Sequence, residues 1–186
     1  MGVVGAGAVL GELAAEANRE AIPNIARLLP AARAVGVQVL HCLVLRRPDA
    51  LGANHNARLF AAASALGSDL SPESEGASLL PDLGPEPTDL VLTRYHGVGP
   101  MGGTDLDPIL RNLGVSTIVV VGVSVNIAIP NLVMDAVNAA YQVVLPRDGV
   151  AGVPRAYAEQ VIDYSLTLLT TVVTTQELLN VWSLAP

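Results

Sequence analysis

Short runs of apolar residues recur along the chain, separated by longer stretches in which apolar and polar positions alternate with a helical period. Within each run the apolar residues are consecutive and many are β-branched, which is typical of a parallel strand that is buried on both faces. The sequence therefore predicts buried strands at VQVLHCLVL (37–45), DLVLT (89–93), STIVVVG (116–122) and YQVVLP (141–146).

Helical patterns fill the stretches between these strands. The first runs from about Leu10 to Val35 and stops at Gly36, and its Pro23 and Pro30 are expected to bend or divide it. Further helices are expected at 105–113, 129–140 and 154–169, followed by a short strand at 171–175 and a terminal helix from Gln176.

This alternation of strands and helices predicts the fold class. Right-handed crossovers join parallel strands through helices, so we expect a three-layer α/β sandwich with a mainly parallel, Rossmann-like sheet. The length of 186 residues, 51% of them hydrophobic, suits one domain spanning residues 1–186. The stretch 67–89, rich in Ser, Pro, Gly and acidic residues, is expected to be a surface loop.

Charge and cysteine content exclude several classes of function. The chain has 17 acidic and 10 basic residues, a net charge of -7, which argues against nucleic acid as a partner. Every basic residue is Arg, so a mechanism that needs a lysine is excluded. The single Cys cannot form an intrachain disulfide, and neither a secretory signal nor a membrane span is recognisable, which favours the cytoplasm.

Loops that follow the strands are the expected place for a ligand, because open parallel sheets bind ligands at the carboxyl ends of their strands. Loops at 46–60, 94–103, 123–130 and 147–154 meet this condition, and we expect a small-molecule site where they converge. No close spacing of His, Cys or acidic residues indicates a metal. The glycine-rich start GVVGAGAVLG has no strand before it, so it gives little support to a dinucleotide cofactor.

Arginines dominate the first of these loops. Arg46, Arg47 and Arg58 could hold an anionic substrate, because guanidinium groups bind carboxylates through paired hydrogen bonds. Surface ion pairing or a subunit contact explains them equally well. After the next strand come Arg94 and His96, for which a role in the site competes with packing of the glycine-rich loop that follows.

His41 and Cys42 adjoin on the first predicted strand. Successive side chains on a strand point to opposite faces, so at most one of the two faces the site. Cys42 is either a nucleophile or, as is more common for a lone thiol, a buried inert residue. Asp148 ends another strand and can hold a loop or cap a turn rather than act as a base.

Residues 103–152 (GTDLDPILRNLGVSTIVVVGVSVNIAIPNLVMDAVNAAYQVVLPRDGVAG) resemble the most diagnostic block of the isochorismatase-like, or cysteine hydrolase, superfamily. That block has a G-T-x-L helix start, a strand, G-V-x-x-x-x-C-V with a following helix, and then G-Y-x-V and D-A. Upstream, GVQVLHCLVL is similar to the second strand of the family, and GVVGAGAVLGELA to the segment after its first strand. The resemblance implies the fold predicted above and a relationship to hydrolases of small molecules.

The family uses an Asp, a Lys and a nucleophilic Cys, and this sequence departs from that triad at each position. The Cys position falls on Ala128, whose methyl group cannot attack a carbonyl. The Lys position falls at or beside Arg94, which can hold an anion but does not exchange protons near neutral pH. The Asp belongs at the end of a first strand that this sequence lacks.

That first strand is central in the family's sheet. Its absence is expected to leave two neighbouring strands with unpaired backbone groups. Residues upstream of Met1 are our favoured source of the strand, and another segment or another subunit is the alternative.

The resemblance also implies a non-proline cis peptide bond near Val123 and Ser124. In the family this loop presents backbone N–H groups that can stabilise an oxyanion. Ser124 and Asn126 are the polar side chains that remain there, so binding or water-mediated chemistry stays open without the Cys.

Our leading hypothesis is a divergent isochorismatase-like protein that binds or acts on a small carbonyl or carboxylate compound without a nucleophilic Cys. Its catalytic candidates are Arg94, His96 as a base and Asn126, with Ala128 at the Cys position, and its substrate-binding candidates are His41, Cys42, Arg47, Val123 and Ser124. The alternatives are an inactive homologue that serves as a binding or assembly subunit, and transfer of the nucleophile role to Cys42. Apolar helix faces at 129–140 and 176–184, together with the family, favour a homo-oligomer.

Overall fold

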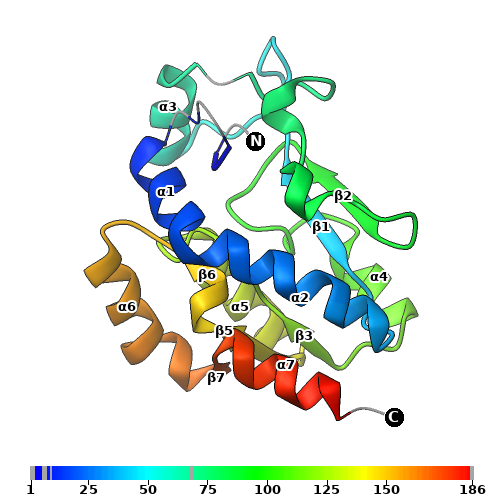
Figure 1. The fold of residues 1–186 in the computed structure, drawn as a ribbon. Coiled ribbons are helices and arrows are strands. Elements are labelled where there is room, and N and C mark those ends of the chain that lie inside the picture. The colour runs from blue at the N-terminus through cyan, green and yellow to red at the C-terminus, as the bar shows by residue number, and fades with distance from the viewer. Residues whose placement is uncertain (1–2, 6–7, 9, 68, 185–186) are drawn as a thin grey trace.

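The computed structural model describes the chain except for residues 1–2, 6–7, 9, 68 and 185–186, so part of the glycine-rich start lies outside the described residues. Parallel strands form the middle layer of a three-layer α/β fold (Figure 1). The strands are β1 (Leu40–Val44), β2 (Leu90–Arg94), β3 (Thr117–Val119), β4 (Gly122–Val123), β5 (Gln142–Pro146), β6 (Val150–Ala151) and β7 (Thr171–Val173). This is the fold class that the alternating pattern predicts.

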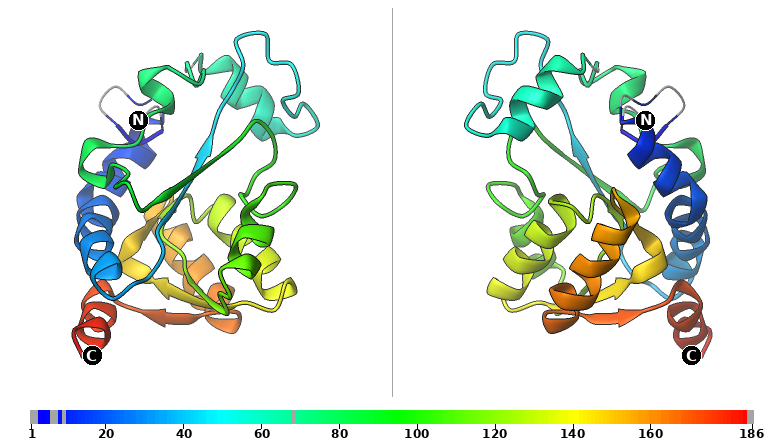
Figure 2. Two further views of the ribbon diagram at one scale, coloured as in Figure 1. Left: turned by 90° about the vertical axis from the view of Figure 1, so that its right-hand side faces the viewer. Right: turned by 90° about the vertical axis from the view of Figure 1, so that its left-hand side faces the viewer.

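Helices cover both faces of the strands (Figure 2). One layer holds α1 (Gly11–Glu16), the π-helical turn η1 (Ala17–Ala21), α2 (Ile22–Ala34) and α7 (Thr175–Ser183), and the other holds α4 (Leu106–Asn112), α5 (Ala128–Asn138) and α6 (Arg155–Tyr164). Helix α3 (Arg58–Ala65) follows β1 near the carboxyl ends of the strands. Single 3-10 turns occur at η2 (Glu75–Ala77), η3 (Pro81–Leu83), η4 (Arg147–Gly149) and η5 (Leu166–Leu168).

All strand pairs in the described chain are parallel, but they do not form one continuous sheet. β1 pairs with β2, β5 pairs with both β3 and β7, and β4 pairs with β6. The β1–β2 ladder is therefore separate from the β3–β5–β7 ladder, and Figure 1 shows β1 and β3 as the neighbouring strands of the two ladders. This is the arrangement expected of a sheet that lacks one central strand.

The main hydrophobic core lies between the strands and the layer of α4, α5 and α6. Its most buried members include Val125, Val133, Leu145 and Leu166. Leu40, Cys42 and Leu92 pack against the same core from the β1–β2 ladder, together with Ile118 from β3. Both ladders therefore cover one core, although no hydrogen bonds join them in the described chain.

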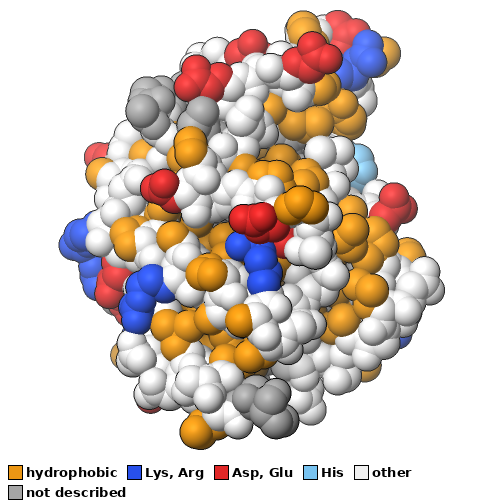
Figure 3. Space-filling view, turned by 45° about the vertical axis from the view of Figure 1, so that its right-hand side comes forward, with side chains coloured by type: hydrophobic (Ala, Val, Ile, Leu, Met, Phe, Trp, Pro, Cys, Tyr) orange, Lys and Arg blue, Asp and Glu red, His pale blue; other side chains and the backbone are white. Residues whose placement is uncertain are grey.

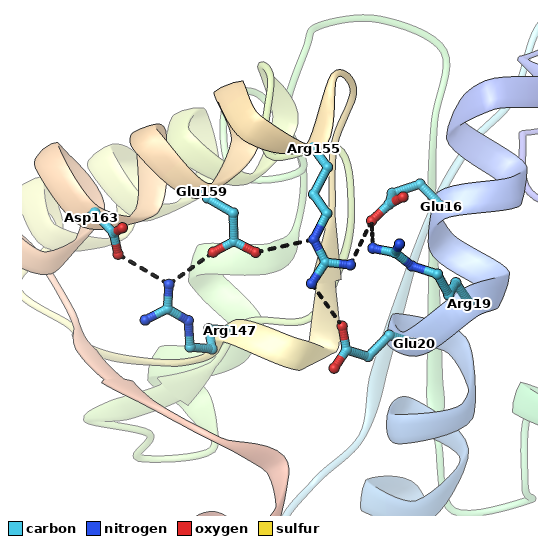
Figure 4. A network of polar contacts seen from close by, with 7 residues as sticks. All are labelled: Glu16, Arg19, Glu20, Arg147, Arg155, Glu159 and Asp163. Atoms are coloured by element: carbon cyan, nitrogen blue, oxygen red, sulfur yellow. Dashed lines mark hydrogen bonds and ion pairs between the residues drawn. The ribbon is translucent and has the colours of Figure 1, made fainter.

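A second, smaller core holds the N-terminal helix in place. Ala17, Ala21, Ile22 and Ala151 are its buried members, and Val4 and Val123 are among the partly buried residues packed against it. An ion-pair network adds to this contact on the surface (Figure 4). Arg155 of α6 lies 3.3 Å from a carboxylate oxygen of Glu16 and 3.4 Å from one of Glu20.

Several element boundaries differ from prediction. Pro30 lies inside α2 without ending it, and Pro23 occupies the first turn, where a helix does not use the missing N–H. The first helix changes to π-helical geometry at η1, and the backbone stays helical on both sides of that segment. The predicted strand 116–122 forms two strands because Gly122, with φ of 113°, turns the chain so that β4 pairs with β6. Helix α3 begins within the predicted loop 46–60 and continues through residues 61–65, for which no element was predicted.

No described helix is long and apolar enough to cross a membrane. On the face shown in Figure 3, basic side chains are scattered among acidic and apolar ones and form no continuous basic area.

Candidate functional site

Two asparagines tie together the loops at the carboxyl ends of the strands. The Asn54 side chain accepts a hydrogen bond from the backbone N–H of Gly97 at 2.7 Å, which joins the loop after β1 to the loop after β2. Asn126 accepts from the backbone N–H of Val153 at 2.9 Å and donates to the carbonyl of the same residue. The amide of Asn126 thus holds the loop after β4 against the loop after β6, and both of its polar atoms are engaged.

The loop that ends in α5 has the backbone expected of an oxyanion site. The Val123–Ser124 peptide bond is cis, as the resemblance predicts. The carbonyl of Ser124 accepts hydrogen bonds from the N–H groups of Ile127 and Ile129. The N–H groups of Asn126 and Ala128 find no acceptor in the described chain. They lie at the start of an 11-residue helix, where the dipole favours negative charge.

Ala128 is the first residue of α5, half-buried, with no side-chain cap before it. A helix N-terminus would favour a thiolate or an oxyanion at this place. The methyl group of Ala128 offers neither a nucleophile nor a proton acceptor. Chemistry at this point therefore depends on backbone donors and on neighbouring side chains.

Cys42 and Arg94 lie on the neighbouring strands β1 and β2, two positions apart in the ladder register. Both line a small hollow closed from the other side by the loop after β2, and its lining is Cys42, Leu43, Leu92, Thr93, Arg94, Pro100 and Thr104. Burial lowers the pKa of Arg94, and the nearby Cys42 opposes that shift. Burial raises the pKa of the Cys42 thiol, and the charge of Arg94 opposes this in turn.

The guanidinium of Arg94 has an unmet hydrogen-bonding group. Its Nε is buried and has no hydrogen-bond partner in the described chain. A buried donor without a partner is unfavourable by about 1 to 3 kcal/mol, and more when it belongs to a charged group. Arg94 therefore suits an acceptor that the described residues do not provide.

His96 and its loop lie beside this hollow. The ring of His96 lies against Gly103, where an added Cβ would come within 3.0 Å of the ring Cε1. Thr104 donates to the carbonyl of Pro100, and its hydroxyl oxygen accepts from the N–H of Leu106 at the start of α4. His96 is exposed, so its ring is accessible from solvent near the mouth of the site.

Gly99 joins the same loop to α5. A Cβ at Gly99 would come within 2.0 Å of the Asn131 side-chain oxygen, so only glycine permits this close approach. The loop after β2 thus contacts Arg94 through Pro100 and the first turns of α5 through Gly99. Sequence reasoning missed the part played by Gly99 and Asn131, because their contact joins distant segments and has no local pattern.

His41 lies apart from these groups. Its Nε2 is 2.9 Å from a carboxylate oxygen of Asp89. The carboxylate of Asp89 also accepts two hydrogen bonds from Arg33 of α2, one at each oxygen. The side chains of His41 and Asp89 are 8% and 1% exposed. His41 therefore faces α2 near the amino end of β1, whereas Cys42 faces the opposite side, as strand alternation requires.

The remaining predicted residues have structural partners. Arg47 lies exposed in the loop after β1 and pairs with its neighbour Asp49 at 2.7 Å. Asp148 accepts hydrogen bonds from the N–H and the hydroxyl of Thr175, so it holds the start of α7, as one of its two predicted roles requires. Val123 is the last residue of β4, and Ser124 follows it directly.

The structure thus brings part of the predicted site together. Cys42, Arg94 and His96 gather at the loop after β2, and Val123, Ser124, Asn126 and Ala128 at the start of α5. His41 and Arg47 are bound to other partners. No group of three or more His, Cys, Asp or Glu side chains suited to a metal ion occurs among the described residues.

A family model, the isochorismatase domain, matches residues 7–177. The chain belongs to the isochorismatase family. Family membership agrees with the resemblance drawn from residues 103–152 and extends it over most of the chain. No curated protein matches this chain.

Solved structures of isochorismatase relatives share the fold. An isochorismatase family protein from Desulfovibrio vulgaris is 28% identical with a TM-score of 0.77, over 88% of this chain and 84% of that one. A cysteine hydrolase from Pseudomonas syringae has a TM-score of 0.78 at 23% identity, over 92% and 84% of the two chains. N-carbamoylsarcosine amidase from Thermoplasma acidophilum has a TM-score of 0.69 at 20% identity, over 84% and 83%.

Proposed function

We propose that this isochorismatase family member binds a small carbonyl or carboxylate compound at the carboxyl ends of its strands, and that any reaction there proceeds without a covalent intermediate. The observation on which this rests is the Nε of Arg94, which is buried and lacks a partner in the described chain. A ligand carboxylate would provide the missing acceptor and a negative charge together.

The start of α5 supports the second half of the proposal. The N–H groups of Asn126 and Ala128 are free to donate to a ligand oxygen, and the helix dipole adds to their effect. Pro100 lines the hollow beside Arg94, and Gly99 of the same loop contacts Asn131 near the start of α5. One compact ligand could therefore contact Arg94 at one end and the α5 donors at the other.

The side chains at the site could play only a few chemical roles. Arg94 would hold an anionic group, and the α5 donors would polarise a carbonyl. His96 is an exposed base candidate in the loop after β2, so it would be the group that activates water. Asn126 serves this site as a positioning residue, because its amide is already bound to Val153.

Ligand-dependent thermal unfolding tests the binding proposal. A panel of small amides, enol ethers, carbamoyl compounds and their carboxylate products is added to the protein and to two variants that each lose one arginine. Arg94→Gln should lose the rise in Tm, whereas Arg47→Gln, which removes an exposed arginine paired with Asp49, should keep it. An equal rise in all three proteins, or none in any, would refute the role given to Arg94.

Product formation decides between an enzyme and an inactive homologue. The absence of a nucleophile at Ala128 favours a binding or assembly subunit as the second candidate. Mass spectrometry of the same incubations should detect turnover that is lost in His96→Ala if the protein is an enzyme. Ligand-dependent stabilisation without any product would instead assign the protein to the binding class.

A further inference from the structure

Asn131 differs from the other half-buried asparagines because its side chain has no hydrogen bond in the described chain. Asn24, Asn54 and Asn126 are half-buried as well, and each of them bonds to a backbone group of a distant segment. Side-chain amides that folding withdraws from water normally find such partners, because an unpaired polar group lowers the stability of the fold. The free amide of Asn131 therefore suits a partner that the described residues do not provide.

Asn131 lies on the side of α5 that Ala128 occupies. Ile129, Val133 and Ala136 are the buried residues of this helix and mark the side that faces the core. Residues three positions apart are neighbours on a helix surface, so the side chains of Ala128 and Asn131 lie next to each other. The free amide is thus close to the start of α5, where the N–H groups without an acceptor are proposed to hold a ligand oxygen.

Gly99 leaves room for this amide in the loop after β2. A Cβ at Gly99 would come within 2.0 Å of the Asn131 Oδ1 and 3.0 Å of its Cγ. Gly99 does not have a positive φ, so space for the amide, rather than backbone conformation, makes a glycine necessary here. Packing therefore holds the amide beside the loop while its polar atoms stay unbonded within the described chain. The next residue, Pro100, lines the hollow beside Arg94.

The amide adds a hydrogen-bond acceptor to a site whose other proposed contacts are donors. The Arg94 guanidinium and the backbone N–H groups of Asn126 and Ala128 can only donate. The Asn131 side chain offers both a C=O and an NH2 group. A ligand carboxamide also carries an N–H beside a C=O, so it can form two hydrogen bonds with the Asn131 amide. An ester or a carboxylate has no N–H for such a pair.

We propose that Asn131 determines the ligand specificity of this site by pairing with a carboxamide. The inference rests on the proposed function, because it takes the ligand carboxylate to lie at Arg94 and the ligand C=O near the start of α5. The preferred ligand therefore carries a carboxylate at one end and a carboxamide at the other. Replacing its N–H removes about one neutral hydrogen bond, which corresponds to a loss of affinity of about tenfold.

Isothermal titration calorimetry with matched ligands tests the proposal. The probes are the half-amides of malonic, succinic and glutaric acid, and each is compared with the methyl half-ester of the same length, which keeps the carboxylate and the C=O but lacks the N–H. The native chain should bind at least one half-amide about tenfold more tightly than its half-ester. Asn131→Leu should lose this preference, whereas Asn138→Leu, at an exposed position of the same helix, should keep it.

NMR of the native chain gives a second readout that does not depend on the folding of a variant. The side-chain NH2 signals of Asn131 should shift when a half-amide binds and should shift less with its half-ester. A half-amide that binds without moving these signals would overturn the proposal, because Asn131 would then not contact the ligand.

Arg94→Gln separates the failure of this inference from the failure of the proposed function. It should weaken the half-amide and the half-ester alike, since both carry the carboxylate. If it does so, but the native chain shows no preference or Asn131→Leu retains one, the role of Asn131 is wrong and that of Arg94 stands. A native chain that binds neither class of ligand at any length would overturn both.

Discussion

Cys42 and Arg94 show how burial sets the chemistry of single residues in this site. Burial raises the pKa of the thiol and lowers that of the guanidinium, and the two groups oppose each other's shift. The thiolate is the reactive form of Cys, so a raised pKa makes Cys42 a poor nucleophile near neutral pH. Its surroundings agree with the structural role for this residue and give no support to a relocated nucleophile.

Alkylation by iodoacetamide at pH 7.5, followed by mass spectrometry, tests the structural role given to Cys42. Cys42 should react slowly in the native protein. After unfolding, it should react as fast as a model thiol. In Ala128→Cys, the new thiol at the start of α5 should react about tenfold or more faster than Cys42, because the helix N-terminus favours the thiolate. Equal rates for the two thiols in the folded variant would contradict the assignment.

Asp89 is the most constrained carboxylate at the amino end of the strands. Its hydrogen bond with Arg33 holds its pKa well below the usual range, although burial acts in the opposite direction, and His41 adds a second bond. Because the folded pKa lies below the unfolded value of about 3.9, this carboxylate stabilises the fold above that pH. The stabilisation declines as the pH falls from about 5 toward the folded pKa.

Replacing Asp89 by Asn should lower the free energy of unfolding by about 3 kcal/mol at pH 7, because it leaves Arg33 without its buried partner. The loss should become smaller at pH 3, where the native carboxylate also contributes less. Urea unfolding at the two pH values measures both effects. Asp49→Asn, which removes an exposed carboxylate paired with Arg47, serves as the control and should change little.

At the scale of elements, an ion-pair network fastens the N-terminal helix to α6. Arg155 bridges Glu16, Glu20 and Glu159, while Arg147 joins Glu159 to Asp163 (Figure 4). These side chains are partly exposed, so each pair contributes little by itself. These ion pairs help to hold α1 and η1 in place, because the other contacts of these two segments with the domain are made mainly by small apolar residues.

Arg155→Gln should therefore loosen α1 and η1 more than it destabilises the whole protein. We expect a loss of about 1 kcal/mol in urea unfolding and faster cleavage by trypsin at Arg19. Salt at 0.5 M should reproduce part of this effect in the native chain. The exposed Arg58→Gln is the matched control, and equal cleavage rates in both variants would show that the network does not hold the helix.

At the scale of the whole molecule, the exposed apolar surface bears on assembly. Leu168, Val181 and Leu184 are 80%, 64% and 85% exposed, and Tyr164 is 77% exposed. Exposed apolar side chains that form one continuous area are typical of surfaces that associate. The homo-oligomer favoured by the sequence stays a prediction, and these residues indicate where it would form.

Analytical ultracentrifugation checks that prediction. The native chain should sediment as a species larger than a monomer at micromolar concentration, and Val181→Glu should shift it toward the monomer by placing a charge on the apolar face of α7. Asn180→Glu adds the same charge beside that position and should change the distribution less. A native chain that is monomeric across the range would contradict the prediction.

Much of the fold was predictable because local patterns determine it. The apolar runs at β1, β2, β3 and β5 and the amphipathic helix α5 were recognised within a few residues. The predicted burial on both faces holds mainly for β5, because most residues of β1, β2 and β3 are half-buried or exposed. The errors fall where local rules compete. Pro30 stays within α2 because the packing of Ile25, Leu28 and Ala32 outweighs one lost hydrogen bond, and α3 has no buried residue to give it a clear pattern.

The site was predictable in position but only partly in its members. Strand ends and the family motif located Arg94 and the loop before Ala128, because both follow from the order of residues along the chain. His41 bonds to Asp89, which is 48 residues away, and Asn126 bonds to Val153, which is 27 residues away. No local sequence pattern predicts contacts over such separations. Such contacts engage polar side chains that the sequence alone would leave available to bind a ligand.

By itself, the sequence determined the fold class, the family and the absence of a nucleophile at Ala128, since each depends on residue type and spacing. Only the tertiary structure decided that the Nε of Arg94 is buried without a partner in the described chain, that Cys42 rather than His41 faces the core beside it, and that the β1–β2 and β3–β5–β7 ladders are separate. Burial, pairing and edge exposure are properties of neighbours in space, and the chain brings those neighbours together only on folding.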